Sequence, residues 1–179
     1  MKINLSYYKS AWLNYQWSIL YEFGLEGFAD WNSTQGTILS NLFQSKILSK
    51  NIHYDEIDKS KFEVNTEGIK RPFNFDNLEI TDFDHYPNYN EYEKIIKEFS
   101  QEEDWGDDKE DFRSLVIRTD YLIRERTNFQ NGFWLLNRDK LKKEKGKLDE
   151  INWIYAYWIL IVEIDQTNKK IRTIDLGYD

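Results

Sequence analysis

Apolar residues recur at steps of three and four positions through residues 7–23, which is the spacing of one face of an α-helix. Tyr8, Trp12 and Ile19 belong to this stripe, and Gly24 and Gly27 follow at places suited to ending the element. The pattern predicts a helix over about 7–23, although aromatic residues at this density are also typical of a β-strand.

The same spacing predicts a second helix over about 37–49, with Ser33 and Thr34 as candidate N-caps. Between residues 51 and 90 the composition changes to many Asn and Asp residues and includes both prolines. This texture predicts loops with short strands, such as 61–65 and 78–83.

Two further elements are predicted in the second half of the chain. A helix is expected over about 90–100, where Tyr92, Ile96 and Phe99 share one face. Residues 114–124 contain a cluster of β-branched side chains and are predicted to form a strand.

The C-terminal segment predicts a β-hairpin. Residues 153–165 are aromatic and β-branched, residues 166–170 are polar with Asn168 suited to a turn, and residues 171–176 alternate apolar with polar. The first strand is apolar on both faces, as a central strand is when both sides are covered. We therefore predict an α+β fold in which N-terminal helices pack on a mainly antiparallel sheet that includes this hairpin.

Length and composition favour one folded domain. The chain has 179 residues, 40% of them hydrophobic and 17% aromatic, which is enough apolar surface to build one core. We expect a single domain over residues 1–179, with an irregular acidic segment at about 51–111.

The absence of cysteine excludes disulfides, thiolate nucleophiles and cysteine-bound zinc. The opening residues carry no secretory signal pattern, and the longest apolar run, at 153–162, is about half the length of a bilayer span. These features predict a cytoplasmic protein that does not engage a membrane, and no residue pattern implies a cofactor.

Charge is distributed unevenly along the chain, whose net charge is −8. Residues 55–111 hold nineteen acidic and seven basic side chains, whereas residues 112–147 hold four acidic and ten basic ones. An acidic field repels phosphate backbones and attracts cationic proteins, so we expect a basic protein partner and no direct binding of nucleic acid.

The acidic run "EEDWGDDKEDF", residues 102–112, is the strongest candidate for a partner surface. Its carboxylates can pair with Lys and Arg, and its tryptophan is a typical interface anchor. The predicted partner-binding residues are Glu102, Glu103, Asp104, Trp105, Asp107, Asp108, Glu110 and Asp111. A solvated acidic loop and an oxygen-ligated metal site are alternatives, and the spacing does not match a calcium loop.

Two histidines, His53 and His85, lie beside carboxylates, and His85 is flanked by Asp82 and Asp84. An imidazole near a carboxylate suits general acid–base or metal chemistry, but a surface histidine in a polar loop is the more common arrangement. No nucleophile elbow or glycine-rich phosphate loop is present, so no catalytic residue is predicted.

The basic segment from Arg113 to Lys147 also has two interpretations. Its cations, interleaved with Phe133 and Trp134, are compatible with a stacking and phosphate-binding surface. The overall negative field favours the other interpretation, in which these cations pair with the acidic block across the fold.

Small, acidic, aromatic-rich proteins without cysteine or a catalytic motif resemble the immunity proteins that protect bacteria from their own polymorphic or contact-dependent toxins. The closing segment "YWILIVEIDQTNKKIRTIDLGYD" is similar to the end of several such α+β proteins, both in its hairpin and in its short tail. The resemblance implies an acidic inhibitor that neutralises a cognate basic toxin, such as a nuclease, by occupying its active-site or substrate groove.

Three other hypotheses remain open from the sequence. A phage or plasmid inhibitor that mimics nucleic-acid charge would use the same acidic surface. A small metal-assisted hydrolase or transferase would use His85 with Asp82 or Asp84. A protein that oligomerises through exposed tyrosines is the third.

Overall fold

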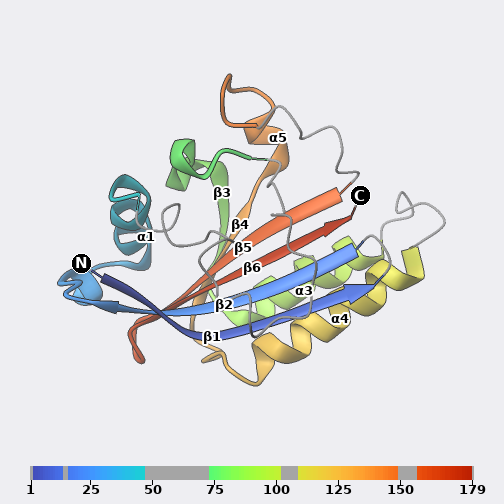
Figure 1. Cartoon of the computed structure of the whole chain (residues 1–179), viewed down its shortest axis with the longest axis horizontal. Helices are drawn as coiled ribbons and strands as arrows, with labels where there is room; N and C mark the ends of the chain where they lie inside the picture. The colour runs from blue at the N-terminus through green and yellow to red at the C-terminus, as the bar shows by residue number, and fades with distance from the viewer. Residues whose placement is uncertain (1, 14–15, 47–72, 102–108, 149–156, 179) are drawn as a thin grey trace, which may run out of the picture.

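One antiparallel sheet of six strands organises the part of the chain that the structure describes (Figure 1). The structure is a computed structural model, and it describes residues 2–13, 16–46, 73–101, 109–148 and 157–178. In the order in which they lie side by side, the strands are β1 (Lys2–Leu13), β2 (Gln16–Glu26), β6 (Lys170–Tyr178), β5 (Tyr157–Asp165), β4 (Gly132–Leu136) and β3 (Phe83–Tyr86). The predicted α+β class and the predicted C-terminal hairpin, β5–β6, are confirmed.

Helices cover both faces of this sheet. The helices are α1 (Gln35–Gln44), α3 (Tyr89–Ser100), α4 (Lys109–Arg124) and the short α5 (Arg138–Leu141). Short 3₁₀ turns are η1 (Asp30–Asn32), η3 (Phe75–Asn77) and η4 (Ile80–Asp82). Figure 1 shows α3 and α4 lying together along the sheet, away from α1.

The two faces hold two separate hydrophobic clusters. On the first face, Leu39 of α1 packs in one cluster with Leu160 of β5. On the second face, Phe112 of α4 packs in the other cluster with Ile161 of β5. Because successive residues of a strand point to opposite faces, β5 is apolar at odd and even positions alike, as predicted for a central strand.

The helix predicted over residues 7–23 is wrong, because residues 7–13 lie in β1 and residues 16–23 lie in β2, and the two strands pair antiparallel. β2 lies between β1 and β6, with Leu20 facing α3 and α4 while Ile19 and Tyr21 face the α1 side. A strand buried on both faces loses its period of two, so steps of three and four between apolar residues arise by coincidence. Gly27, at φ 71°, ends this strand instead of a helix.

The strand predicted over residues 114–124 is also wrong, because this segment is helical. The buried side chains of α4 recur with helical spacing and are Phe112, Leu115, Val116, Thr119 and Ile123. The Thr119 hydroxyl donates to the Leu115 carbonyl at 2.8 Å and is hydrogen-bonded to Ser18 of β2. Burial of this face therefore outweighs the modest preference of β-branched residues for strands.

Helix α3 agrees with the prediction within one residue. Helix α1 is confirmed in place, but it begins at Gln35 and ends at Gln44 instead of continuing as predicted, and residues 47–49 of that prediction lie outside the described residues. The N–H of Thr37 donates to the Thr34 side chain at 3.3 Å, so the N-cap of α1 is Thr34, one of the two predicted candidates, and not Ser33. Asn88 caps α3 in the same way, through the N–H of Glu91 at 3.1 Å.

The predicted strand at 78–83 is correct only at its end, since η4 occupies Ile80–Asp82 and β3 begins at Phe83. A reciprocal cap holds this turn, because the N–H of Glu79 donates to the Asp82 carboxylate at 2.7 Å. The other predicted strand, 61–65, lies outside the described residues.

A row of charged side chains crosses three adjacent strands on the α3/α4 face. Arg172 of β6 is directly opposite Glu22 of β2 and Glu163 of β5. Its Nε donates to Glu22 at 2.8 Å, one Nη to Glu163 at 2.9 Å, and the other Nη to Asp165 at 3.3 Å. All four side chains are buried, so one guanidinium compensates three carboxylates away from water.

Burial and the Arg172 guanidinium act in opposite directions on the pKa values of the flanking carboxyl groups. Burial raises the pKa of Glu22, but its hydrogen bond to Arg172 and the positive charge outweigh that, and the pKa lies below 4.5. For Glu163 burial dominates and raises the pKa, although Arg172, Thr127 and Asn131 all donate to its Oε1. Its Oε2 is buried without a hydrogen-bond partner among the described residues.

We expect Arg172→Met to lower the free energy of unfolding by about 3–5 kcal/mol, because it leaves buried carboxylates without their cation. Urea denaturation at pH 7 measures this change. Lys170→Met is the matched control, since Lys170 also reaches Glu22 but at 3.5 Å and from a more exposed position; we expect it to cost less than about 1 kcal/mol. Equal losses in the two variants would contradict the central role of Arg172.

Glu163→Gln should change how stability depends on pH. A carboxyl group with a raised pKa in the folded state binds more protons than in the unfolded state, so its contribution to stability is lost as the pH rises above 4.5. Glutamine cannot ionise, so the unfolding free energy of Glu163→Gln should improve relative to the wild type between pH 4 and pH 8. Chemical denaturation across that range checks the sign, and parallel pH profiles would refute it.

Candidate functional site

The predicted partner-binding residues fall into two groups. Glu110 and Asp111 lie in the first turn of α4, where the positive end of the helix dipole stabilises carboxylates. The Glu110 side chain is 75% exposed and accepts a hydrogen bond from Arg113 at 2.6 Å. The remaining predicted residues, at 102–108, lie outside the described residues.

Helix α4 presents one exposed face along its length. Positions i, i+4, i+7 and i+11 of a helix share a face, and here they are Glu110, Ser114, Ile117 and Tyr121, all of them exposed. Ile117 is 55% exposed and Tyr121 is 63% exposed. With Phe129, 54% exposed in the turn that follows α4, they are the exposed large hydrophobic side chains of the described part of the chain.

Polar contacts fix this helix against α3. The Tyr89 hydroxyl donates to Asp120 at 2.6 Å, and Arg124 Nε donates both to Tyr89 Oη at 2.7 Å and to Asp120 at 3.0 Å. Arg124 also forms an ion pair with Glu93. Burial and the hydrogen bond to Asp120 raise the pKa of Tyr89, so this hydroxyl stays protonated and serves as a donor.

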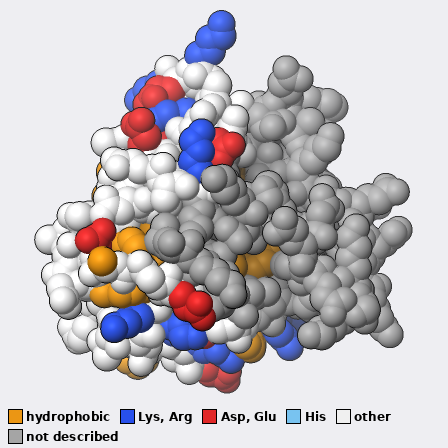
Figure 2. Space-filling model, turned by 60° about the vertical axis from the view of Figure 1, so that its left-hand side comes forward, with side chains coloured by type: hydrophobic (Ala, Val, Ile, Leu, Met, Phe, Trp, Pro, Cys, Tyr) orange, Lys and Arg blue, Asp and Glu red, His pale blue; other side chains and the backbone are white. Residues whose placement is uncertain are grey.

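The acidic and basic segments of the chain meet in the fold, as predicted. Four basic side chains from residues 112–147 pair with carboxylates from residues 55–111: Arg113 with Glu110, Arg124 with Glu93, Lys140 with Asp84, and Lys147 with Asp82. Figure 2 shows the result on one face, where Lys or Arg side chains lie next to Asp or Glu side chains. These pairs reduce the cations available for a phosphate-binding surface.

The residues around His85 do not converge on a catalytic arrangement. Asp84 pairs with Lys140 at 2.8 Å, and the buried Asp82 pairs with Lys147 at 2.7 Å. His85 instead stacks on Trp134, with ring centroids 4.2 Å apart, and burial lowers its pKa. No hydrogen bond or ion pair joins this imidazole to a carboxylate within the described ranges.

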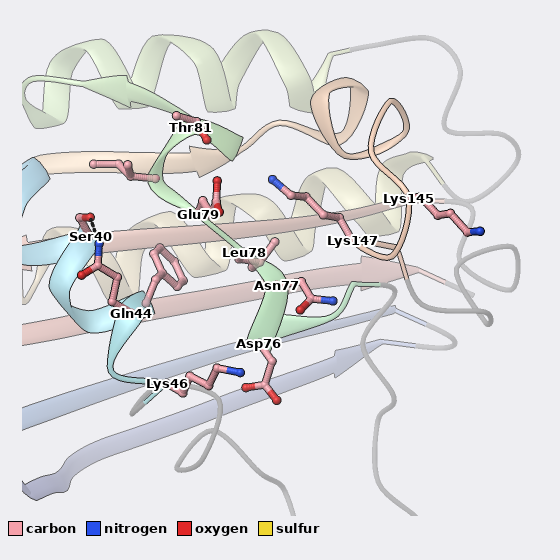
Figure 3. Close-up of a pocket in the computed structure, with 12 residues that line it drawn as sticks. Ser40, Gln44, Lys46, Asp76, Asn77, Leu78, Glu79, Thr81, Lys145 and Lys147 are labelled. Atoms are coloured by element: carbon pink, nitrogen blue, oxygen red, sulfur yellow. Dashed lines mark hydrogen bonds between the residues drawn. The ribbon is translucent and has the colours of Figure 1, made fainter.

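A pocket of about 530 Å³ lies between the end of α1, the turns η3 and η4, and the loop after α5 (Figure 3). Phe43 and Leu78 form apolar parts of its wall. The Lys147 ammonium at its side is held by Asp82 and Glu144, and Figure 3 shows Lys145 pointing the opposite way. The pocket therefore presents no concentrated charge that would select a ligand.

Neither a metal centre nor a membrane span is found in the part of the chain that is described. No group of three or more His, Asp or Glu side chains there could hold a metal ion. No helix among those residues is both long and apolar enough to cross a bilayer.

The chain is thus an α+β protein, and the exposed face of its helix α4 includes two large hydrophobic side chains, Ile117 and Tyr121. No protein-family model matches it, and comparisons with curated proteins and with solved structures find no match.

Sequence reasoning missed Ile117 and Tyr121 because it treated their segment as a strand. The signal that identifies them is the helical spacing of the buried positions Phe112, Leu115 and Val116. Once those residues define the inner face, Ile117 and Tyr121 fall on the outer one.

We expect Lys147→Met to destabilise the fold by about 3–5 kcal/mol, because Asp82 would remain buried without its cation. Lys143→Met is the control, since Lys143 is exposed in the same loop and should change stability by less than about 0.5 kcal/mol. Thermal and urea unfolding measure both variants. A similar small effect in the two would show that the Asp82–Lys147 pair is dispensable.

Proposed function

We propose that this protein is an acidic inhibitor that binds another protein, of the kind represented by bacterial immunity proteins. Its target is a basic toxin, such as a nuclease, whose active-site or substrate groove it occupies in the cytoplasm. The observation that carries the proposal is the net negative charge that remains after carboxylates of residues 55–111 pair with cations of residues 112–147.

The net charges of the two segments show that the charge left after pairing is negative. Residues 55–111 carry a net charge of −12 and residues 112–147 carry +6, so complete neutralisation between them still leaves a net charge of −6. The basic segment is also partly engaged in ion pairs, which weakens the case for a nucleic-acid-binding surface. An unbalanced acidic region is suited to a cationic protein partner.

The physical reasoning follows from what a nuclease groove must bind. Such a groove is cationic because its substrate is a polyphosphate, and an acidic protein uses the same field for rapid capture. A carboxylate-rich inhibitor therefore accelerates association and blocks the site at once. An inhibitor that mimics nucleic-acid charge would use the same surface, and the identity of the captured partner separates it from an immunity protein.

The enzyme hypothesis has less support. His85 is stacked on Trp134, and each neighbouring aspartate is paired with a lysine. The orientation of a catalytic imidazole is commonly fixed by a carboxylate, and no hydrogen bond or ion pair joins His85 to one within the described ranges.

Capture from the native host tests the proposal. A variant with Asp104, Asp107 and Asp108 changed to Asn, together with Asp111→Asn, removes four of the run's carboxylate charges while retaining the side-chain size. We expect the wild type to recover one basic protein, and the variant to associate with it more slowly and with a weaker dependence on salt.

The control is Glu91→Gln, an exposed carboxylate on α3, which should leave association within about two-fold of the wild type. Recovery of no basic partner by the wild type would refute the proposed function. Capture of the same partner by the four-residue variant at an unchanged rate would remove the acidic run from the interface.

A further inference from the structure

We propose that Glu163 is a pH-dependent latch for the connection between α4 and β4, residues 125–131. The latch keeps this connection closed on the sheet while Glu163 is protonated, and it releases the connection as the carboxyl group ionises. The inference does not rest on the proposed function, because it concerns only contacts within the chain.

One carboxyl group ties the connection to the sheet. The Thr127 hydroxyl and the Asn131 side-chain amide both donate to Glu163 Oε1 at 2.6 Å. Residues 128–130, which lie between these two donors in the chain, are exposed. The connection is therefore a short surface segment with two inward side chains that converge on one buried atom.

The second oxygen of this carboxyl group is left without compensation. The Glu163 side chain is fully buried, and its Oε2 makes no hydrogen bond in the described part of the chain. Oε1 already accepts from three donors, since Arg172 also reaches it at 2.9 Å. We therefore expect a proton bound by this carboxyl group to lie on Oε2.

The neighbouring strands do not supply Glu163 with a cation of its own. Arg172 of β6 pairs with Glu163, with Glu22 of β2 and with Asp165, so one guanidinium serves three carboxylates. Phe133 of β4, directly opposite Glu163, is apolar. Two further cations pair with Glu22 instead, at 3.5 Å and 3.7 Å, and they are Lys170 and Arg126.

The described parts of the helices bring no further cation to Glu163. Tyr92 of α3 interacts electrostatically with it, but burial raises the pKa of the Tyr92 hydroxyl, so that group stays neutral. On α4, Asp120 pairs with Arg124 at 3.0 Å, which engages that guanidinium elsewhere. A proton is therefore the simplest compensation for the charge of Glu163.

Proton binding and closure of the connection are thermodynamically linked. Burial raises the pKa of Glu163 in the closed state, although Arg172, Thr127 and Asn131 act in the opposite direction. When the connection lifts away, water reaches Oε2 and the pKa falls towards its usual value. The closed state thus binds the proton more tightly, so opening becomes more favourable as the pH rises, by up to about ten-fold for each unit by which the pKa falls.

Amide hydrogen exchange followed by NMR between pH 5 and pH 8 tests the latch. The reporters are the hydrogen-bonded N–H groups of Tyr89, Thr127 and Asn131, and that of Tyr89 donates to the Phe129 carbonyl at 3.2 Å. After correction for the intrinsic effect of pH on exchange, we expect their protection in the wild type to fall by more than about three-fold over this range. Glu163→Gln cannot ionise and should keep its protection constant within about 1.5-fold.

Three controls isolate the latch from other effects of pH. Glu125→Gln removes an exposed carboxylate of the same connection and should keep the wild-type fall in protection. The amides of α1, on the opposite face of the sheet, report unfolding of the whole chain and should fall less than those of the connection. Thr127→Val removes one of the two bonds to Glu163, so it should lower protection at every pH and keep the fall.

Each outcome decides the inference. A fall confined to the connection and abolished by Glu163→Gln establishes the latch, whatever partner the protein binds. Protection that is constant or rises with pH in the wild type overturns it, as does a fall of equal size in Glu163→Gln or in α1. If Glu163→Gln does not fold, Thr127→Val decides: lower protection that still falls with pH supports the latch, and protection equal to that of the wild type overturns it.

Discussion

Arg172 and the carboxylates that surround it tie the three central strands of the sheet into one register. Glu22, Arg172 and Glu163 stand directly opposite one another on β2, β6 and β5. Because side chains alternate between the two faces of a strand, a slip of one residue would carry Arg172 to the α1 side and leave the carboxylates unpaired. A buried charged row of this kind penalises every alternative register more strongly than an apolar row would.

The same row sets where α4 lies. Thr127 and Asn131, in the connection from α4 to β4, both donate to Glu163 at 2.6 Å, so the chain leaving the helix is tied to the charged row. Near the middle of α4, Thr119 is hydrogen-bonded to Ser18 of β2. These contacts help to determine which face of α4 is buried and which side chains, such as Ile117 and Tyr121, remain exposed.

Outside the core, some of the carboxylates are neutralised by nearby cations and others are not. The pairs at Asp82, Asp84 and Glu93 neutralise part of the acidic block and attach it to the basic segment. The net charge that remains is negative, and in the sequence the carboxylates are most concentrated at residues 102–111, which lead into and begin α4.

The sequence by itself determined the elements whose signal is local. The C-terminal hairpin, α1 with its Thr34 cap, and α3 follow from residue spacing and capping chemistry, and the charge imbalance follows from counting. Tertiary structure decided the elements at 7–23 and 114–124. Burial on both faces erases the period of β2, and packing of the inner face of α4 outweighs the preferences of β-branched residues. Only the tertiary structure shows that Arg172 lies beside Glu22 and Glu163 and which face of α4 is exposed, since both depend on which distant strands and helices become neighbours.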